Sequence, residues 1–184
     1  MKIFLLSIFA VCVVATYASA QQTGFGYGVK AGVNISKYTG GDADFKAGFT
    51  GGIFADYRFC DRFALSADVL YARQGAKGDE GKLRTDNLNI PVLANFYIVK
   101  GLAVKAGVQP GFLLSAKSKE DGVTTDVKDA FKKFDLSIPV GLSYDFRFGL
   151  ILDARYNIGV SNISKVDGTT ARNSVIAVTA GWRF

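Results

Sequence analysis

The chain has 184 residues, enough for one domain, and its 22 basic and 16 acidic residues give a formal net charge of +6. The basic residues are scattered among acidic ones and form no stripe with interleaved aromatics, so the composition predicts no nucleic-acid partner. The chain contains no histidine, which excludes Ser-His-Asp catalysis and most zinc sites.

The N-terminus has the pattern of a secretory signal. A basic start is followed by an apolar run from Ile3 to Val14 and by the small residues Ala18-Ser19-Ala20. The run is shorter than the roughly 20 residues that a membrane-spanning helix needs. We therefore predict a cleaved signal peptide over residues 1–20 and one mature domain over residues 21–184. Cys60 is the only cysteine of this mature domain and can form no internal disulfide.

Apolar and polar residues alternate in eight segments after the signal, as they do in β-strands with one apolar face. In chain order the predicted strands are Phe25–Ile35, Ala47–Phe59, Phe63–Gln74, Asn87–Val99, Leu102–Leu114, Phe134–Arg147, Leu150–Val160 and Val175–Phe184. Tight turns alternate with long polar loops, and the predicted loops are Ser36–Lys46, Gly75–Asp86, Ser115–Lys133 and Ser161–Arg172. An even number of strands, with short turns at one end and long loops at the other, is typical of outer-membrane β-barrels.

Alternation alone does not say which face is outside, because a soluble lipocalin-like barrel has its apolar face inside. Three features favour a barrel with its apolar face in lipid. Aromatic residues gather at the tight-turn end, as an interfacial belt requires: Phe25, Tyr27, Tyr57, Phe59, Phe63, Phe96, Tyr144, Phe146, Trp182 and Phe184. The polar face carries glycines that leave room for long side chains opposite: Gly26, Gly28, Gly32, Gly48, Gly52, Gly107, Gly111, Gly141 and Gly159.

The third feature is a set of charged residues of both signs on the polar face. Buried charges are tolerated when they are paired, so a closed lumen requires this balance. We predict a lumen charge network of Lys30, Asp56, Arg58, Asp68, Lys105, Asp145, Asp153, Arg155 and Arg183. The predicted fold is all-β, a single eight-stranded antiparallel transmembrane β-barrel.

Four short motifs carry a resemblance to a known family. They are Gly28–Asn34 (GVKAGVN), Leu88–Val92 (LNIPV), Ile138–Tyr144 (IPVGLSY) and the terminal Gly181–Phe184 (GWRF). With them, nearly the whole mature chain resembles the eight-stranded outer-membrane β-barrel proteins of the OmpX/PorT-like type, often named the porin family. These motifs are specific to the architecture and say little about function.

The resemblance implies a location in the outer membrane of a Gram-negative-type bacterium. It also implies insertion by the outer-membrane assembly machinery, which recognises a terminal strand that ends in an aromatic residue. Trp182 and Phe184 match that signal. The chain departs from ordinary strand chemistry at Pro91, Pro110 and Pro139, since each removes a hydrogen-bond donor. Bulges near loop ends could absorb Pro91 and Pro139, but the sequence offers no account of Pro110.

No segment predicts catalysis or a cofactor. A general base poised near neutral pH is most easily a histidine, which is absent. A paired-carboxylate mechanism through Asp145 and Asp153 is the remaining alternative, but basic neighbours make barrel filling the better explanation. Asp42 and Asp44, and the Glu120-Asp121 pair, lack the spacing of a calcium loop. We predict a protein that is not an enzyme, with no metal and no cofactor.

The third predicted loop is densely charged. It is either a solvated hairpin or a docking site for a protein partner or lipopolysaccharide phosphates. Its basic candidates are Lys117, Lys119, Lys128, Lys132 and Lys133. Three functions remain open: a non-enzymatic barrel with interacting loops and a filled lumen, a PorT-like accessory of a secretion or envelope complex, and a soluble periplasmic ligand-binding barrel.

Overall fold

The computed structural model describes residues 24–39, 46–77, 82–120, 123–126, 132–161 and 172–184. In chain order its strands are β1 (Gly24–Thr39), β2 (Lys46–Cys60), β3 (Phe63–Lys77), β4 (Lys82–Asn89), β5 (Val92–Val99), β6 (Leu102–Glu120), β7 (Val123–Asp126), β8 (Phe134–Asp145), β9 (Leu150–Gly159) and β10 (Arg172–Arg183). Within the described ranges, no helix has the length and apolar character to cross a membrane. The predicted signal peptide and parts of the four predicted loops lie outside these ranges.

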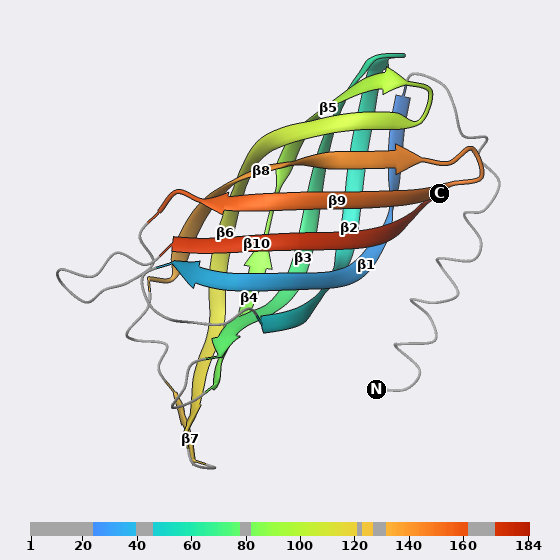
Figure 1. The fold of residues 1–184 in the computed structure, drawn as a ribbon. Helices are drawn as coiled ribbons and strands as arrows, with labels where there is room; N and C mark the ends of the chain where they lie inside the picture. The colour runs from blue at the N-terminus through green and yellow to red at the C-terminus, as the bar shows by residue number, and fades with distance from the viewer. Residues whose placement is uncertain (1–23, 40–45, 78–81, 121–122, 127–131, 162–171) are drawn as a thin grey trace.

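The strands form one antiparallel sheet that closes on itself (Figure 1). β1 pairs with β2 on one side and with β10 on the other, so the first and last strands meet. β4 and β5 are two halves of one barrel strand, since both pair with β3 and with β6. β7 pairs with β6 beyond the loop end of the barrel. The wall therefore has eight strands, which confirms the predicted eight-stranded antiparallel β-barrel.

The prolines stand where the hydrogen-bond ladder is already interrupted. Pro91 separates β4 from β5. Pro110 of β6 faces this break, and its carbonyl accepts a hydrogen bond from Ile90 N at 2.9 Å. Pro139 of β8 lies in a gap of the pairing between β6 and β8. Because proline has no N–H to donate, it removes the fewest backbone hydrogen bonds where the ladder is already interrupted. The same reason accounts for Pro110.

Between register shifts at Arg58/Cys60, Asp86/Asn87 and Tyr97/Val99, side chains alternate between the outer wall and the lumen. In β9, the outward Leu152 and Tyr156 are 45% and 44% exposed, whereas the inward Asp153 and Arg155 are 2% and 4% exposed. Apolar residues outside and ionic residues inside reverse the arrangement of a water-soluble protein. This is the arrangement of a barrel whose wall faces hydrocarbon.

Aromatic rings form belts at both ends of this apolar wall. At the tight-turn end, rings contact one another in pairs such as Tyr57–Phe59, with centroids 4.8 Å apart, as the sequence predicts. The sequence did not reveal the second belt near the loop end, where Phe49 contacts Tyr71 at 5.7 Å and Phe112 contacts Phe134 at 5.7 Å. Two belts that bound an apolar band mark the two interfaces of a membrane.

Glycines on the lumen face permit close approach, although for two different reasons. A Cβ at Gly26 would lie 3.1 Å from the side chains of Arg183 and Asp56, so this glycine makes room for an ion pair as predicted. A Cβ at Gly28 would instead overlap the backbone carbonyl of Trp182 on the neighbouring strand. Such glycines are required by tight approach of the strands themselves.

Three strands, β3, β4 and β6, continue past the loop end of the barrel, and β7 lies wholly beyond it. Pairing of β2 with β3 ends at Thr50–Ala72, and pairing of β6 with β8 ends at Phe112–Phe134. Beyond these points β3, β4, β6 and β7 pair only with one another in the described residues, and Figure 1 shows β6 and β7 reaching past the other strands. We call this extension the protruding sheet; it consists of residues 73–77, 82–86, 115–120 and 123–126.

The protruding sheet corrects two predicted loops. The segments Gly75–Asp86 and Ser115–Lys133 were expected to be loops, but most of their described residues are in strands. Both faces of these strand ends carry polar residues, so the apolar alternation by which the barrel strands were found fades there. How far the strands extend beyond the membrane is therefore shown only by the hydrogen-bond register between them.

Candidate functional site

Five charged side chains meet in the middle of the lumen. We call them the central cluster: Lys30 of β1, Asp68 of β3, Lys105 of β6, and Asp153 and Arg155 of β9. Asp68 accepts hydrogen bonds from Lys30 Nζ at 2.8 Å and from Arg155 Nη1 at 3.2 Å. Asp153 accepts one from Lys105 Nζ at 2.6 Å. Its other oxygen lies 2.7 Å from Arg155 Nε, an ion pair that is not aligned as a hydrogen bond. Cations and carboxylates thus alternate in one continuous network, in the order Lys30, Asp68, Arg155, Asp153 and Lys105.

Burial makes the pairing in the central cluster essential. None of its members is more than 6% exposed, and Asp68 is 0% exposed. Removing an ion from water costs several kcal/mol, and only close partners of opposite charge offset that cost. Three cations share two carboxylates here, so each carboxylate serves two cations. Loss of Asp68 would remove the ion pair of Lys30, and loss of Asp153 would remove that of Lys105.

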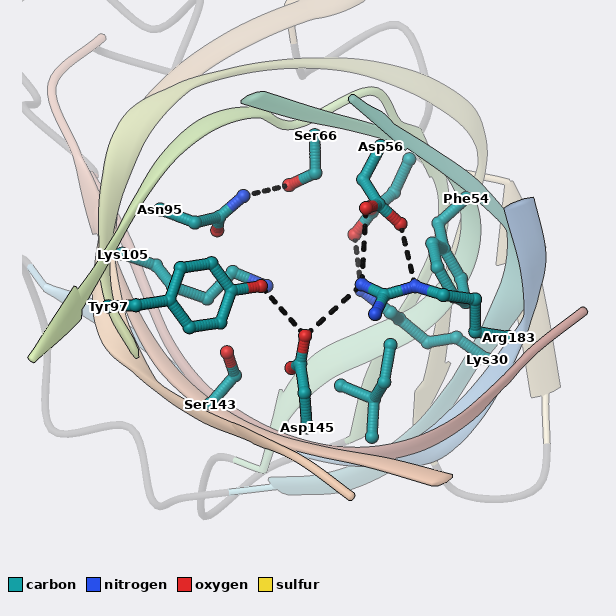
Figure 2. Close-up of a pocket in the computed structure, with 12 residues that line it drawn as sticks. Lys30, Phe54, Asp56, Ser66, Asn95, Tyr97, Lys105, Ser143, Asp145 and Arg183 are labelled. Carbon is teal, nitrogen blue, oxygen red and sulfur yellow. Dashed lines mark hydrogen bonds and ion pairs between the residues drawn. The ribbon is translucent and has the colours of Figure 1, made fainter. Parts of the chain in front are cut away.

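A second set of side chains crosses the lumen at its tight-turn end (Figure 2). We call it the turn-end cluster: Asp56, Arg58, Tyr97, Asp145 and Arg183. Arg183 donates two hydrogen bonds to Asp56, each at 3.1 Å, and one to Asp145 at 3.1 Å. Asp145 also accepts from Tyr97 Oη at 2.7 Å and from Arg58 at 3.5 Å. Two-pronged arginine–carboxylate contacts fix geometry as well as charge, so this cluster ties β2, β5, β8 and β10 together.

A third, uncharged layer fills the lumen toward the loops. Its buried amides are Asn34, Gln74, Asn89, Gln109 and Asn157. Gln109 Nε2 donates to Ser137 Oγ at 3.3 Å, and Asn34 Nδ2 donates to the Phe49 carbonyl at 3.1 Å. These amides line a cavity of about 10 Å³, and a cavity of about 20 Å³ lies between the central and turn-end clusters. Polar side chains therefore occupy the lumen at three levels.

The structure places all nine residues of the predicted charge network in the lumen, divided between the two clusters. Sequence reasoning missed the phenol of Tyr97 and the amide layer. Both lie on the polar face, at positions of the same parity as the charges, so the alternation could have identified them. The alternation does not show which strands face each other across the lumen.

Basic residues also gather on the outer wall beside the loop-end aromatic belt. Arg73 Nε donates to Asp86 Oδ1 at 3.0 Å, and its guanidinium lies 5.0 Å from the centre of the Phe49 ring. Arg84 Nε lies 3.7 Å from the same Asp86 oxygen. Lys117 is exposed and is the register partner of Arg84. One carboxylate therefore has two arginines as neighbours, with a lysine next to them.

The five lysines predicted for loop contacts do not lie together in one loop. Lys117 and Lys119 belong to β6, which corrects their assignment to a loop. Lys132 and Lys133 directly precede β8, and Lys128 lies outside the described residues.

The predicted assembly signal lies at the seam of the barrel. Phe184 N donates to the Tyr27 carbonyl at 2.9 Å, and the two rings are 5.9 Å apart. The Trp182 ring is 41% exposed on the outer wall and lies 6.1 Å from the ring of Phe148. Both terminal aromatics therefore belong to the tight-turn belt.

Among the described residues, no group of three or more histidine, cysteine, aspartate or glutamate side chains could hold a metal ion. The weak calcium candidates Asp42, Asp44 and Asp121 lie outside those residues, and Glu120 ends β6. The absence of a metal therefore stays a prediction.

A family model described as "Outer membrane protein beta-barrel domain" matches residues 19–165. The chain belongs to this family. Its location is accordingly the outer membrane of Gram-negative bacteria. A search of curated proteins gives no significant match.

Solved structures agree with the fold. Neisserial surface protein A (NspA) is 19% identical with a TM-score of 0.63, over 86% of this chain and 97% of that chain. Ail, the attachment invasion locus protein of Yersinia pestis, is 18% identical with a TM-score of 0.56, over 89% of this chain and 100% of that chain. At this level of identity the likeness concerns the architecture, a β-barrel of the outer membrane.

Proposed function

We propose that the protein is a non-enzymatic integral outer-membrane barrel with a sealed lumen, which acts through its outer wall and the protruding sheet. The observation that carries the proposal is a lumen filled by side chains, with its charged groups in ion pairs and cavities of only about 10 and 20 Å³ between them. An eight-stranded barrel has an interior just wide enough to be filled by side chains. Here the central cluster, the turn-end cluster and the amide layer fill it at three levels.

The same pairing supports the absence of catalysis. The two carboxylates that a paired-carboxylate mechanism would need are Asp145 and Asp153. Each is held by two basic side chains, Asp145 by Arg58 and Arg183 and Asp153 by Lys105 and Arg155. Both carboxylates are therefore occupied by ion pairs within the lumen and are not presented to a substrate.

Purified protein in planar lipid bilayers is expected to give no stable single-channel steps. The reason is that an ion in transit would have to break buried ion pairs at two levels of the lumen. The measurement is single-channel current at low and high salt. Stable steps from wild-type protein would overturn the sealed-lumen proposal. A matched control is Asp56→Ala with Arg183→Ala, which removes one bidentate pair and should raise the leak.

The motifs GVKAGVN and IPVGLSY, which lie in β1 and β8, support a finer assignment to the OmpX/PorT-like type. Outer-membrane lipid, lipopolysaccharide and the assembly machinery are the partners we propose for it. A soluble periplasmic ligand-binding barrel is disfavoured by the apolar outer wall, where side chains such as Ile53 are 59% exposed. Fractionation tests this alternative, because a soluble barrel would be released without detergent.

A second candidate function is an accessory role in a secretion or envelope complex. The observation that favours it is the protruding sheet, in which β7 pairs with β6 alone among the described strands. The free edge of a strand offers unpaired N–H and C=O groups to an added strand.

A photo-crosslinker in place of Thr125 of β7 tests the accessory role. If the protein is such an accessory, crosslinking in whole cells should capture a specific protein. The same crosslinker in place of Asp61, in the tight turn between β2 and β3, is the matched control at the other end of the barrel. Capture of lipid alone from Thr125 would remove this candidate function.

A further inference from the structure

The register of the protruding sheet aligns its basic residues in rows. One row across the strands is Arg73, Asp86 and Ser115; the next is Gly75, Arg84, Lys117 and Asp126; the third is Lys77, Lys82, Lys119 and Thr124. These three rows hold six basic residues and two acidic ones. The rows between them are Gln74, Thr85 and Ala116, and Ala76, Leu83, Ser118 and Thr125, and they contain no charged residue. The basic residues thus share alternate rows of the register.

The described side chains of the first two rows show which face Arg73, Arg84 and Lys117 occupy. Arg84 and Lys117 are exposed, whereas Thr85 and Ala116 of the neighbouring row are 2% and 0% exposed. Arg73 lies against the ring of Phe49, an outward residue of the loop-end belt. The basic face of the protruding sheet therefore continues the lipid-facing wall of the barrel.

Among its described side chains, the basic face has three cations, Arg73, Arg84 and Lys117, and one carboxylate, Asp86. Arg84 and Lys117 are directly opposite on neighbouring strands, where Cβ atoms are about 4.5–5.5 Å apart and like charges destabilise a sheet. Asp86 is shared by Arg73 and Arg84, at 3.0 Å and 3.7 Å. An anion seated between Arg84 and Lys117 would convert this repulsion into two favourable contacts.

The position of the basic face decides which anion it meets. Its first row begins at the loop-end aromatic belt, the level of lipid headgroups. Arginine suits phosphate because its planar fork of donors matches the phosphate oxygens. We infer that the outward face of the protruding sheet binds phosphate groups of glycolipids in the outer leaflet, with Arg84 and Lys117 as the central contacts. This inference rests on the proposed function, because it needs the barrel to stand in the outer membrane with the protruding sheet at the outer surface.

The test compares the wild type with the double variant Arg84→Gln, Lys117→Gln in phosphatidylcholine nanodiscs. The probe is diphosphoryl lipid A, added at a few per cent of the lipid, and native mass spectrometry measures how much stays bound to the released protein. Each surface cation near an anionic leaflet strengthens binding about fivefold, so the double variant should retain roughly 25-fold less lipid A. The charge-preserving variant Arg84→Lys, Lys117→Arg should retain most of the binding.

The matched control is Arg62→Gln with Lys100→Gln, two exposed cations in the tight turns at the other end of the barrel. This control should bind diphosphoryl lipid A like the wild type. Heat-modifiable migration on a gel shows that every variant is folded.

Two results would overturn the inference. One is equal retention of diphosphoryl lipid A by the wild type and by the Arg84, Lys117 variant. The other is equal retention of diphosphoryl and dephosphorylated lipid A by the wild type. Stronger binding of soluble dextran sulfate than of lipid A would assign the basic face to a polyanion outside the membrane and also overturn it. If the wild type gave channel currents but still bound lipid A, the sealed-lumen proposal would fail while the glycolipid inference would stand. Failure of the proposed function can therefore be distinguished from failure of this inference.

Discussion

Replacing Asp68 by alanine is expected to lower the free energy of unfolding by about 3–5 kcal/mol, the cost of breaking a buried ion pair by removing one partner. Asp68 has no exposed surface and accepts hydrogen bonds from both Lys30 and Arg155. Without it, Lys30 loses its ion pair, and Arg155 keeps only Asp153, which already pairs with Lys105. The measurement is urea unfolding of protein refolded into phosphatidylcholine vesicles. Fluorescence of Trp182, the only tryptophan, reports the transition from the lipid-facing belt.

Two further variants separate charge pairing from a general effect of mutation. Asp61→Ala removes an exposed carboxylate in the turn between β2 and β3, and it should change stability by no more than about 0.5 kcal/mol. Lys30→Met combined with Asp68→Ala restores the original balance of charge in the central cluster, and it should recover at least half of the loss. If Asp68→Ala proves as harmless as Asp61→Ala, the central cluster does not stabilise the barrel as argued.

Deletion of Phe184 is expected to reduce the amount of protein in the outer membrane by about an order of magnitude, while the free energy of unfolding of refolded protein falls by only about 2 kcal/mol. In the folded barrel Phe184 contributes one backbone hydrogen bond to Tyr27 and one ring contact. Such contacts are each worth about 1 kcal/mol. A large loss of outer-membrane protein would therefore come from failed recognition during assembly. Immunoblots of membrane fractions and urea unfolding in vesicles measure the two effects.

Phe59→Ala is the matched control for the Phe184 deletion. Phe59 belongs to the same tight-turn belt and contacts two rings, at 4.8 Å and 5.7 Å. Its loss should cost at least as much stability as the deletion but leave assembly close to normal. A loop lysine variant such as Lys133→Ala should affect neither quantity. Equal outer-membrane levels for the deletion and for Lys133→Ala would refute the role of the terminal aromatic.

The alternation of residue types predicted the wall of the barrel because side chains on a strand point to opposite faces with a period of two. The same parity assigned Asp68 and Asp153 to the lumen and residues such as Leu152 to the outer wall, and the structure places them there. The glycines could be predicted in part. The role of Gly26 beside an ion pair follows from the pattern, whereas the need for Gly28 comes from the approach of another strand.

The sequence by itself determined the number of barrel strands, the faces of the residues in the predicted strands, and the set of charges that share the lumen. Only the tertiary structure decided the pairing, because Asp68 meets Arg155 from 87 positions away once closure fixes where β3 and β9 stand across the lumen. The structure also decided that β3, β4 and β6 continue past the barrel and form the protruding sheet with β7. Outside the membrane neither face needs to be apolar, so the residue pattern there is weak and backbone hydrogen bonds between strands define the sheet.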